Sequence, residues 1–286
     1  MKIIQELAVR LATEIERNVT LALQEDIGTG DLTALLTPAG NRSRGTVVCR
    51  ENAVLAGRPW FESCFRHLDP DTIIRWSSKD GESVVAGQAL CEIEANTRAL
   101  LSAERPALNF LQTLSATATM TQRYVQVVAG THAHIVDTRK TLPGLRLAQK
   151  YAVRCGGGHN HRLGLYDGIL IKENHIIAAG GVTEALQRAR NLNRRDVFIQ
   201  IEVESLDQLD EALDAGATMI LLDNMDLAQM REAVRRSKDH AKLEASGGVN
   251  LDTVRAIAET GVDRISIGAL TKDVRAIDLS LRHSES

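Results

Sequence analysis

The sequence predicts an α/β protein, an incomplete (β/α) barrel preceded by an N-terminal α+β sandwich domain with a mainly antiparallel sheet and helices. After residue 130, short apolar runs alternate with amphipathic helical stretches, which is typical of a parallel sheet with crossover helices. Before that point, short β-branched runs are separated by turn dipeptides, which is typical of hairpins. We expect the N-terminal domain to span residues 1–115 and to be rejoined by the C-terminal tail 270–286, with the barrel spanning 116–269.

The chain begins with apolar residues at helical spacing from Ile4 to Leu23, which predicts one or two amphipathic helices. The acidic stretch EDIGTGDLT follows, but it lacks the regularly spaced oxygen ligands of a calcium loop. We interpret it as a turn in which Asp31 or Thr33 starts the next element.

From residue 44 onward, β-branched runs separated by Asp-Gly and Ala-Gly pairs predict a small sheet. The stretch 80–104 faintly resembles a lipoyl or biotinyl carrier module, but no Asp-Lys or Met-Lys pair stands at a hairpin tip, so we favour a packing and dimerisation domain. A long helix should start at Ser102, with Pro106 in its first turn, where proline is tolerated. Arg105, at this helix start, is the charge here that we consider functional.

The second half predicts parallel strands at HIVD (134–137), GILIK (168–172), FIQIE (198–202), MILLD (219–223), KLEAS (242–246) and RISIG (264–268). Helices are expected between them, at 183–191, 206–215, 227–236 and 251–259. Each run ends in a polar residue or a glycine, namely Asp137, Lys172, Glu202, Asp223, Ser246 and Gly268. This favours a barrel over a doubly wound sheet, because strand-end residues converge at the C-terminal mouth of a barrel. Only six strands are visible, so we expect an open barrel closed by the N-terminal domain of the same or a neighbouring subunit.

The loops after the last two runs, SGGVN (246–250) and IGALT (267–271), are rich in glycine. Backbone N–H groups and helix N-termini bind phosphate at this place in such barrels. We therefore expect a phosphate site there. A single polar residue at a strand end would be an ordinary helix cap. Six predicted strands that each end in a polar residue or a glycine are harder to explain as caps alone.

Residues 137–175 contain a dense group of basic side chains, although the chain has a formal net charge of −3. A local cationic cluster in an acidic protein indicates a pocket for a small polyanion rather than a nucleic-acid surface. We interpret Arg146, Lys150 and Arg154, at helical spacing, as a solvated helix face. The glycines at 156–158 are expected to be a flexible joint that lets the basic residues on both sides face one dianion.

At 286 residues and 44% hydrophobic content, the chain can bury a substantial core. Its four cysteines stand far apart without metal-binding or disulfide spacing, which favours a reducing compartment. The N-terminal stretch is interrupted by glutamates and lacks a signal-peptide core, and no run approaches the ~20 apolar residues that span a bilayer. We expect a cytoplasmic protein without nucleic-acid or membrane partners.

The predicted mouth combines basic residues, two acids and a glycine-rich loop. Arginine pairs bidentately with carboxylates, so the basic residues suit a dicarboxylate. Glu202 and Asp223 suit Mg²⁺, which prefers oxygen ligands and bridges to substrate phosphates. His159 and His161 have a spacing that zinc sites also use, but no third Cys or His ligand stands nearby.

Several long motifs together resemble the quinolinate phosphoribosyltransferase family, also called nicotinate-nucleotide pyrophosphorylase (carboxylating). They are DTRKTLPGLRLAQKYAVRCGGGHNHRLGLYDGILIKENHI (137–176), EDIGTGDLT (25–33), SAERPALNFLQTLSATAT (102–119), IEVES (201–205), LLDNM (221–225) and ASGGVN (245–250). The resemblance covers nearly the whole chain. It implies that quinolinate and phosphoribosyl pyrophosphate give nicotinate mononucleotide, pyrophosphate and CO₂, with Mg²⁺ required.

The resemblance also implies roles for single positions. The implied quinolinate-binding set is Arg139, His161, Arg162 and Lys172, joined by Arg105 from the other subunit of a homodimer with shared active sites. Lys140 and Lys172 are implied to contact pyrophosphate or the transferred phosphoribosyl group. Glu202 and Asp223 are implied to lie near the ribose hydroxyls and to be the Mg²⁺ ligands. The implied 5′-phosphate cup consists of Ser246, Gly247, Gly248 and Gly268. The implied catalytic residues are Lys140, Lys172, Glu202 and Asp223.

Two functions of the same fold stay open at this point, namely nicotinate phosphoribosyltransferase and a paralogue group linked to molybdenum transport. The number of basic residues, enough for two carboxylates, favours quinolinate over nicotinate. A hexamer of dimers is the larger assembly that the resemblance leaves open.

Overall fold

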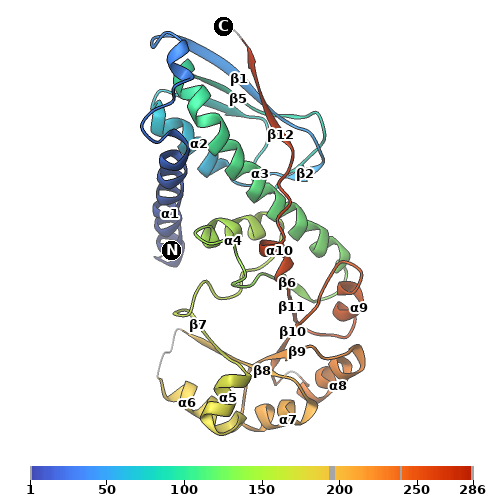
Figure 1. Cartoon of the computed structure of the whole chain (residues 1–286). Helices are drawn as coiled ribbons and strands as arrows, with labels where there is room; N and C mark the ends of the chain where they lie inside the picture. The colour runs from blue at the N-terminus through green and yellow to red at the C-terminus, as the bar shows by residue number, and fades with distance from the viewer. Residues whose placement is uncertain (1, 193–196, 239, 285–286) are drawn as a thin grey trace. The chain divides into compact units, whose positions relative to one another are not determined.

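The computed structural model of the protein describes residues 2–192, 197–238 and 240–284 (Figure 1). The chain forms two compact units. The N-terminal unit comprises residues 1–122, 142–157 and 273–286, and the barrel unit comprises residues 123–141 and 158–272. These limits differ from the expected ones chiefly at 142–157, which belongs to the N-terminal unit although it lies within the range expected for the barrel.

The N-terminal unit is built around the expected antiparallel sheet. Within the described residues the strand order is β12-β1-β5-β3, and a second small sheet pairs β2 with β4. The strands of this unit are β1 (Arg42–Cys49), β2 (Ala53–Val54), β3 (Ile73–Trp76), β4 (Ser83–Val84), β5 (Ala89–Asn96) and β12 (Leu279–Ser284). The last strand of the chain therefore completes a sheet that begins near residue 42.

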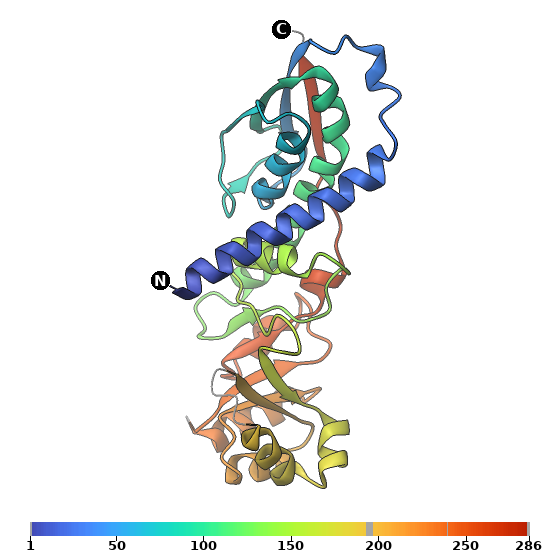
Figure 2. The same ribbon diagram turned by 90° about the vertical axis from the view of Figure 1, so that its left-hand side faces the viewer.

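Helices of the N-terminal unit enclose an aromatic core. They are α1 (Lys2–Ile27), α2 (Arg58–Leu68), most of α3 (Thr97–Val127) and α4 (Arg146–Cys155). Trp60, Phe61 and Phe65 of α2 are fully buried in this core. The Trp60 indole N–H donates to Asn18 Oδ1 at 3.1 Å, so a buried hydrogen bond joins α2 to α1. A single long helix thus occupies the stretch in which one or two were expected (Figure 2).

The acidic turn after α1 is a capped turn, as expected. Asp31 Oδ1 accepts the N–H groups of Thr33 at 2.9 Å and Ala34 at 3.0 Å, at the start of the 3₁₀ helix η1 (Ala34–Leu36). The Ser102 hydroxyl donates to Asp31 Oδ2 at 2.7 Å. These hydrogen bonds lower the pKa of the Asp31 carboxyl. The bond from the Ala34 N–H has the largest effect, and the bond from Ser102 has the next largest.

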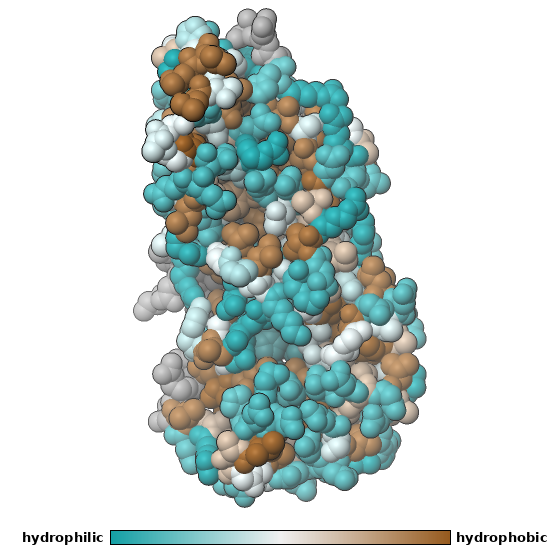
Figure 3. Space-filling model, in the orientation of Figure 1, coloured by the Kyte–Doolittle hydropathy of each residue, from teal (hydrophilic) through white to brown (hydrophobic). Residues whose placement is uncertain are grey.

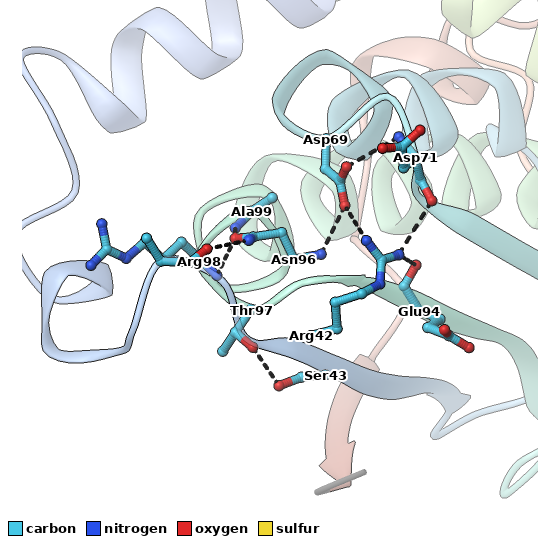
Figure 4. Close-up of polar contacts among 10 residues, drawn as sticks. Arg42, Ser43, Asp69, Asp71, Glu94, Asn96, Thr97, Arg98 and Ala99 are labelled. Carbon is cyan, nitrogen blue, oxygen red and sulfur yellow. Dashed lines mark hydrogen bonds and ion pairs between the residues drawn. The ribbon is translucent and has the colours of Figure 1, made fainter.

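The long helix α3 begins earlier than predicted. Asn96 Oδ1 accepts the N–H groups of Arg98 at 3.0 Å and Ala99 at 3.4 Å and so caps the helix (Figure 4). The predicted start at Ser102 is wrong, because the residue that caps the helix is the asparagine that ends β5. Pro106 consequently lies inside the helix rather than in its first turn.

The barrel unit contains the six predicted strands. Within the described residues they form one sheet in the order β6-β11-β10-β9-β8-β7, and each neighbouring pair is parallel. The strands are β6 (His134–Val136), β7 (Gly168–Ile171), β8 (Phe198–Val203), β9 (Met219–Asp223), β10 (Lys242–Ser246) and β11 (Arg264–Ser266). Because β6 and β7 end this order and do not pair with each other there, the barrel is incomplete, which confirms the predicted fold.

Short helices cover the outer face of this sheet (Figure 1). They are α5 (Glu173–Ala179), α6 (Val182–Asn191), α7 (Leu206–Asp214), α8 (Leu227–Ser237) and α9 (Val254–Ala258), whereas α10 (Ala269–Lys272) follows the C-terminal end of β11. Ser205 and Asp226 cap α7 and α8 by accepting backbone N–H groups at 3.2 and 2.8 Å. The helix predicted at 251–259 is shorter than expected, because Asn250 first forms a turn with Asp252 and Thr253.

Two expectations about the segment 142–157 are wrong. Lys150 is only 1% exposed, so it does not belong to a solvated basic face. Helical spacing indicated that Arg146, Lys150 and Arg154 share a face, but it carries no information about what covers that face. The glycine run is not a loose joint at Gly156, where an added Cβ would overlap the carbonyl oxygen of Ala118 on α3. That glycine allows α4 to end in close contact with α3.

The surface is mixed in character. Figure 3 shows mostly hydrophilic side chains on the visible face, with smaller hydrophobic patches between them. Across the residues that the structure describes, no helix has both the length and the apolar character to cross a membrane.

Candidate active site

The C-terminal ends of the barrel strands bring predicted residues to one face of the sheet. Glu202 on β8 is opposite Leu221 on β9, and Asp223 on β9 is opposite Ser246 on β10. Directly paired residues, and residues two positions apart on a strand, point to the same face. Glu202, Asp223 and Ser246 therefore share a face, as the barrel prediction required.

Lys172 stands directly after β7, and its ammonium group lies 2.6 Å from Glu202 Oε2 on the neighbouring strand. The lysine side chain is half exposed, whereas that of the glutamate is 10% exposed. The Lys172 N–H also donates to His175 Nδ1 at 3.0 Å, which fixes the first turn of α5. The ion pair thus holds an ammonium group where solvent and a ligand can reach it.

Two arginines approach each other in the barrel unit. Arg139 follows β6, and Arg162 precedes β7 and donates from Nη1 to the carbonyl of Gly168 at 3.0 Å. Burial lowers the pKa of Arg162, and the positive charge of Arg139 is the second cause. Two guanidinium groups held this close repel each other, and an anion bound between them would relieve that repulsion.

The side chain of Lys140, in the loop after β6, lies over Gly268, which follows β11. A Cβ at position 268 would be 2.9 Å from Lys140 Cδ, so a larger residue would push the lysine away. The Lys140 backbone is held on both sides, because its N–H donates to Thr138 Oγ1 at 3.0 Å and its carbonyl accepts from Thr271 Oγ1 at 2.8 Å. The backbone beside this lysine is therefore well fixed.

The glycine-rich loop after β10 is shaped by Asn224. The Asn224 N–H donates to the carbonyl of Ser246 at 3.0 Å, and its side chain donates to Asp223 Oδ2 at 3.0 Å. Gly247 has a φ of +101°, and an added Cβ would overlap Asn224 Oδ1. Gly248 has a φ of +60° with open space beside it. The loop therefore depends on glycine at 247 for both backbone and space.

His161 is buried among polar partners, with its side chain 7% exposed. Its Nε2 lies 2.8 Å from Gln200 Oε1, and its Nδ1 accepts the N–H of Arg162 at 2.7 Å. Gln200 in turn donates to Glu244 Oε2 at 3.2 Å. The imidazole is thus part of a chain of polar side chains inside the barrel unit.

The other histidine of the HxH pattern has different partners. The rings of His159 and His134 pack with centroids 4.5 Å apart, whereas the ring of His161 packs edge-on against Phe198 at 5.6 Å. Asp137, at the end of β6, accepts the N–H of His161 at 2.9 Å and so holds the loop between them. The two histidines of the pattern therefore occupy separate environments.

Arg105 belongs to a different unit from the other predicted residues. It lies on α3 in the N-terminal unit, and its side chain is exposed. The remaining predicted positions, from Arg139 to Gly268, lie in the barrel unit.

The sequence reading missed three polar residues that shape this site. Gln200 and Glu244 stand two positions before Glu202 and Ser246 on their strands, and Asn224 follows Asp223. The signal for the first two was a polar residue inside an otherwise apolar strand run, at the two-residue period that points it to the same face. The position of Asn224 two residues before the helix cap Asp226 indicated a loop residue, but nothing in the sequence indicated its positive φ of 55°.

Comparisons with known proteins place this geometry in a family. The family model for the N-terminal domain of quinolinate phosphoribosyl transferase matches residues 31–115, and that for the C-terminal domain matches residues 117–282. The chain belongs to the quinolinate phosphoribosyltransferase family. The predicted resemblance is therefore confirmed over both units of the protein.

Relatives of this family match along nearly their full lengths. A probable nicotinate-nucleotide pyrophosphorylase (carboxylating) of Bacillus subtilis strain 168 is 42% identical over 257 residues, which cover 90% of this chain and 89% of the relative. The solved nicotinate-nucleotide pyrophosphorylase of Francisella tularensis is 43% identical, with a TM-score of 0.92 and coverage of 96% of this chain and 97% of that one. A solved NadC of Streptococcus pyogenes, 36% identical, has a TM-score of 0.93 and covers 96% and 98%. The quinolinate phosphoribosyltransferase fold thus accounts for both units.

Proposed function

We propose that this protein transfers the phosphoribosyl group of phosphoribosyl pyrophosphate to quinolinate and decarboxylates the product to nicotinate mononucleotide, as expected from the sequence. The observation that carries this is the match of both domain models of the quinolinate phosphoribosyltransferase family across residues 31–115 and 117–282. The geometry supports it, because a face with basic residues, acids and a glycine-rich loop suits an anionic acceptor together with a phosphorylated sugar.

Quinolinate is a dianion, and the paired arginines suit it. Burial lowers the pKa of Arg162, and the nearby positive charge of Arg139 lowers it further. A guanidinium pair offers bidentate hydrogen bonds to two carboxylates, which a monocarboxylate would only half satisfy. Lys172, whose ammonium group is half exposed, supplies the third positive charge, and His161 adjoins Arg162 in this set.

The phosphoribosyl group would bind at the glycine-rich end of the barrel. Gly247 and Gly248 add no side chains of their own over the backbone N–H groups of the loop after β10, and Gly248 has open space beside it. Ser246 adds a hydroxyl, and Gly268 leaves room for the Lys140 side chain beside it. We assign the 5′-phosphate to this loop and the pyrophosphate to the region of Lys140.

The chemistry follows from the charges. Loss of pyrophosphate from the ribose gives the sugar carbon oxocarbenium character, which the carboxylates of Glu202 and Asp223 would stabilise. The pyridine nitrogen of quinolinate then forms the new bond to that carbon. The quaternised nitrogen accepts the electron pair of the adjacent carboxylate as CO₂ leaves, so the protein has to position the ring and exclude water.

The acids are also the residues that would hold Mg²⁺. Glu202 and Asp223 come from neighbouring strands and point to one face, and Mg²⁺ is commonly bound by one or two carboxylates together with substrate phosphates. This donor set fits such an ion. When bound, it would neutralise negative charge that accumulates on the departing pyrophosphate. Lys172, 2.6 Å from Glu202, orients that carboxylate before substrates arrive.

We further propose a homodimer with shared active sites. What supports it is the open barrel, whose edge strands β6 and β7 are not joined to each other in the described residues, and the exposed position of Arg105 on a different unit. Arg105 of one protomer would add a positive charge to the quinolinate site of its partner. A cytoplasmic location is supported by the four cysteines, which are all free thiols.

The direct test is the reaction itself. Purified protein with quinolinate, phosphoribosyl pyrophosphate and Mg²⁺ should release CO₂ and nicotinate mononucleotide, and omission of Mg²⁺ should abolish turnover. Calorimetric titration should show much tighter binding of quinolinate than of nicotinate. Equal affinity would favour a nicotinate phosphoribosyltransferase, and binding without any turnover would favour a function like that of the paralogue group linked to molybdenum transport.

Subunit sharing has a separate test. Mixed dimers of an Arg105→Ala protomer and a Lys172→Ala protomer should recover part of the activity that each homodimer lacks, since one of the two sites in such a dimer is intact. No recovery in mixed dimers verified by native mass spectrometry would refute the assignment of Arg105 to the partner's site.

A further inference from the structure

Three polar side chains form a buried chain inside the barrel unit, below the strand-end residues. Glu244 on β10 and Gln200 on β8 lie on the same face of the sheet as Glu202, because Glu244 and Glu202 are both opposite Leu221 of β9. Glu244 and Gln200 are each 1% exposed. The chain ends at His161, whose Nε2 lies 2.8 Å from Gln200 Oε1. These residues are therefore buried one layer beneath the proposed substrate site.

The direction of each hydrogen bond in this chain is determined. The backbone N–H of Arg162 can only donate, so His161 Nδ1, at 2.7 Å, is the acceptor and carries no proton. The proton of the neutral imidazole is then on Nε2, which faces Gln200 Oε1. A carboxylate accepts hydrogen bonds only, so the carboxylate of Glu244 turns the NH₂ group of Gln200 toward itself and the carbonyl toward His161.

This arrangement is not explained by stability. Glu244 Oε1 is buried and has no hydrogen-bond partner among the described residues. A buried acceptor without a partner destabilises a protein, and such exceptions concentrate at functional sites. The other oxygen, Oε2, lies 3.6 Å from His161 Nε2 in addition to its bond with Gln200. Glu244 therefore orients Gln200 through Oε2 while its other oxygen stays without a hydrogen-bond partner among the described residues.

We propose that Glu244 and Gln200 are positioning residues that hold His161 as the neutral tautomer protonated at Nε2. His161 then holds the backbone N–H of Arg162, and with it the position of that arginine. His161 thus positions Arg162 within the quinolinate-binding set. This inference rests on the proposed function for the role of Arg162, but the tautomer does not depend on it.

The tautomer is tested first, on the unmodified full-length protein. Long-range proton–nitrogen NMR correlation of the labelled histidines, with His161→Asn to assign the signals, reports which ring nitrogen carries the proton. We expect a protonated Nε2 and an unprotonated Nδ1 at neutral pH. A proton on Nδ1, or on both nitrogens, would overturn the proposal. This readout needs no turnover, so a protein inactive on quinolinate would refute the proposed function and leave this test in force.

The role of Glu244 is tested with Glu244→Gln, which keeps the size but lets the side chain donate, so that Gln200 can turn its NH₂ group toward His161. We expect the Nε2–H tautomer to be lost and the quinolinate KM to rise about tenfold or more, as for a buried polar group left without its partner. The kcat and the KM for phosphoribosyl pyrophosphate should stay near wild type. A folded Glu244→Gln variant that keeps both the wild-type His161 tautomer and the wild-type quinolinate KM would overturn the proposal. A raised quinolinate KM together with the wild-type His161 tautomer would overturn it as well.

A rescue and a control separate positioning from general destabilisation. Gln200→Glu combined with Glu244→Gln reverses the two partners while keeping an acceptor toward His161, so tautomer and quinolinate KM should return toward wild type. Lack of recovery in a folded double variant would count against the proposal. Glu211→Gln is the matched control, because Glu211 accepts the N–H and hydroxyl of Thr183 at 3.1 and 3.2 Å on the outer helices. It should leave the quinolinate KM unchanged.

Discussion

Lys172 and Glu202 are joined across neighbouring strands by an ion pair of 2.6 Å, although we assign them to different parts of the reaction. The lysine side chain is half exposed and the glutamate side chain almost buried, so it is the lysine that can turn toward an arriving anion. Because an ion pair with one exposed partner contributes about 1 kcal/mol or less to stability, its replacement should affect activity far more than folding.

Glu202→Gln removes the carboxylate that we assign to the oxocarbenium-like transition state and to Mg²⁺. We expect kcat to fall about a hundredfold or more, while quinolinate binding measured by calorimetry changes little. Glu204→Gln is the matched control, since Glu204 is an exposed acid just beyond the same strand. Equal losses in both variants would show that the effect is not specific to Glu202.

The two glycines after β10 should differ sharply in their tolerance of alanine. Gly247→Ala requires a Cβ at a φ of +101° that overlaps Asn224 Oδ1, so we expect a loss of about 2 kcal/mol or more in unfolding free energy and loss of activity. Gly248→Ala meets open space at a φ of +60° and should cost about 1 kcal/mol. Urea denaturation of both variants measures the difference, and equal costs would contradict this account of the loop.

Arg162→Ala and Arg139→Ala should each raise the quinolinate KM by one to two decades, which corresponds to about 1.5 to 3 kcal/mol for a charge-assisted hydrogen bond. Steady-state kinetics at saturating phosphoribosyl pyrophosphate isolates this effect. Arg231→Ala, on the exposed face of α8, is the control and should behave as wild type. Unchanged kinetics in the first two variants would place these arginines outside the quinolinate pocket.

Asp31 should make the stability of the N-terminal unit depend on pH. The pKa of Asp31 in the folded state lies below the ordinary aspartate value. The contribution of Asp31 to the free energy of unfolding is therefore complete above the ordinary aspartate pKa, and it is lost as the pH falls through the folded-state pKa. Wild type should therefore exceed Asp31→Asn in thermal stability at about pH 6, and the difference should shrink at about pH 3. Calorimetry at both pH values tests this, and a constant difference would refute it.

The cysteines should be unreactive in the native protein. Burial raises the pKa of Cys64 to about 12 and also raises that of Cys91 and Cys49, so little thiolate forms near neutral pH. Burial likewise raises the pKa of the partly exposed Cys155 to about 12. A thiol reagent at mildly alkaline pH should label the native protein slowly and the unfolded protein at all four cysteines. Fast labelling of one native thiol would contradict the burial seen here.

Much of the fold could be predicted because it depends on periodic patterns. The barrel strands were each short apolar runs with a polar end, and β7 to β10 lie within one residue of their predicted limits. The start of α3 was missed because capping by Asn96 depends on the path of β5, whereas Ser102, equally suitable as a cap by composition, lies inside the helix. The burial of Lys150 was missed because periodicity identifies a common face of a helix but not what packs against it.

The site could be predicted only as a set of strand-end residues. Its geometry depends on side-chain partners that no spacing encodes, such as the bond of Arg162 to His161 Nδ1 and the approach of Lys140 to Gly268. Gln200 and Glu244 were overlooked because a polar residue within an apolar strand is easily taken as an exception to the pattern. In a barrel it marks the interior layer beneath the mouth.

The pairing of β12 with β1 bears on how the chain is made. Residues 279–284 are synthesised after β1, β3 and β5, yet they supply the edge of the sheet that those strands form. The barrel strands β6 to β11 all precede β12 in the chain, although residues 142–157 between them belong to the N-terminal unit. All barrel strands are therefore synthesised before the N-terminal sheet can be completed, and a cut near residue 278 would leave β1 with an exposed, aggregation-prone edge.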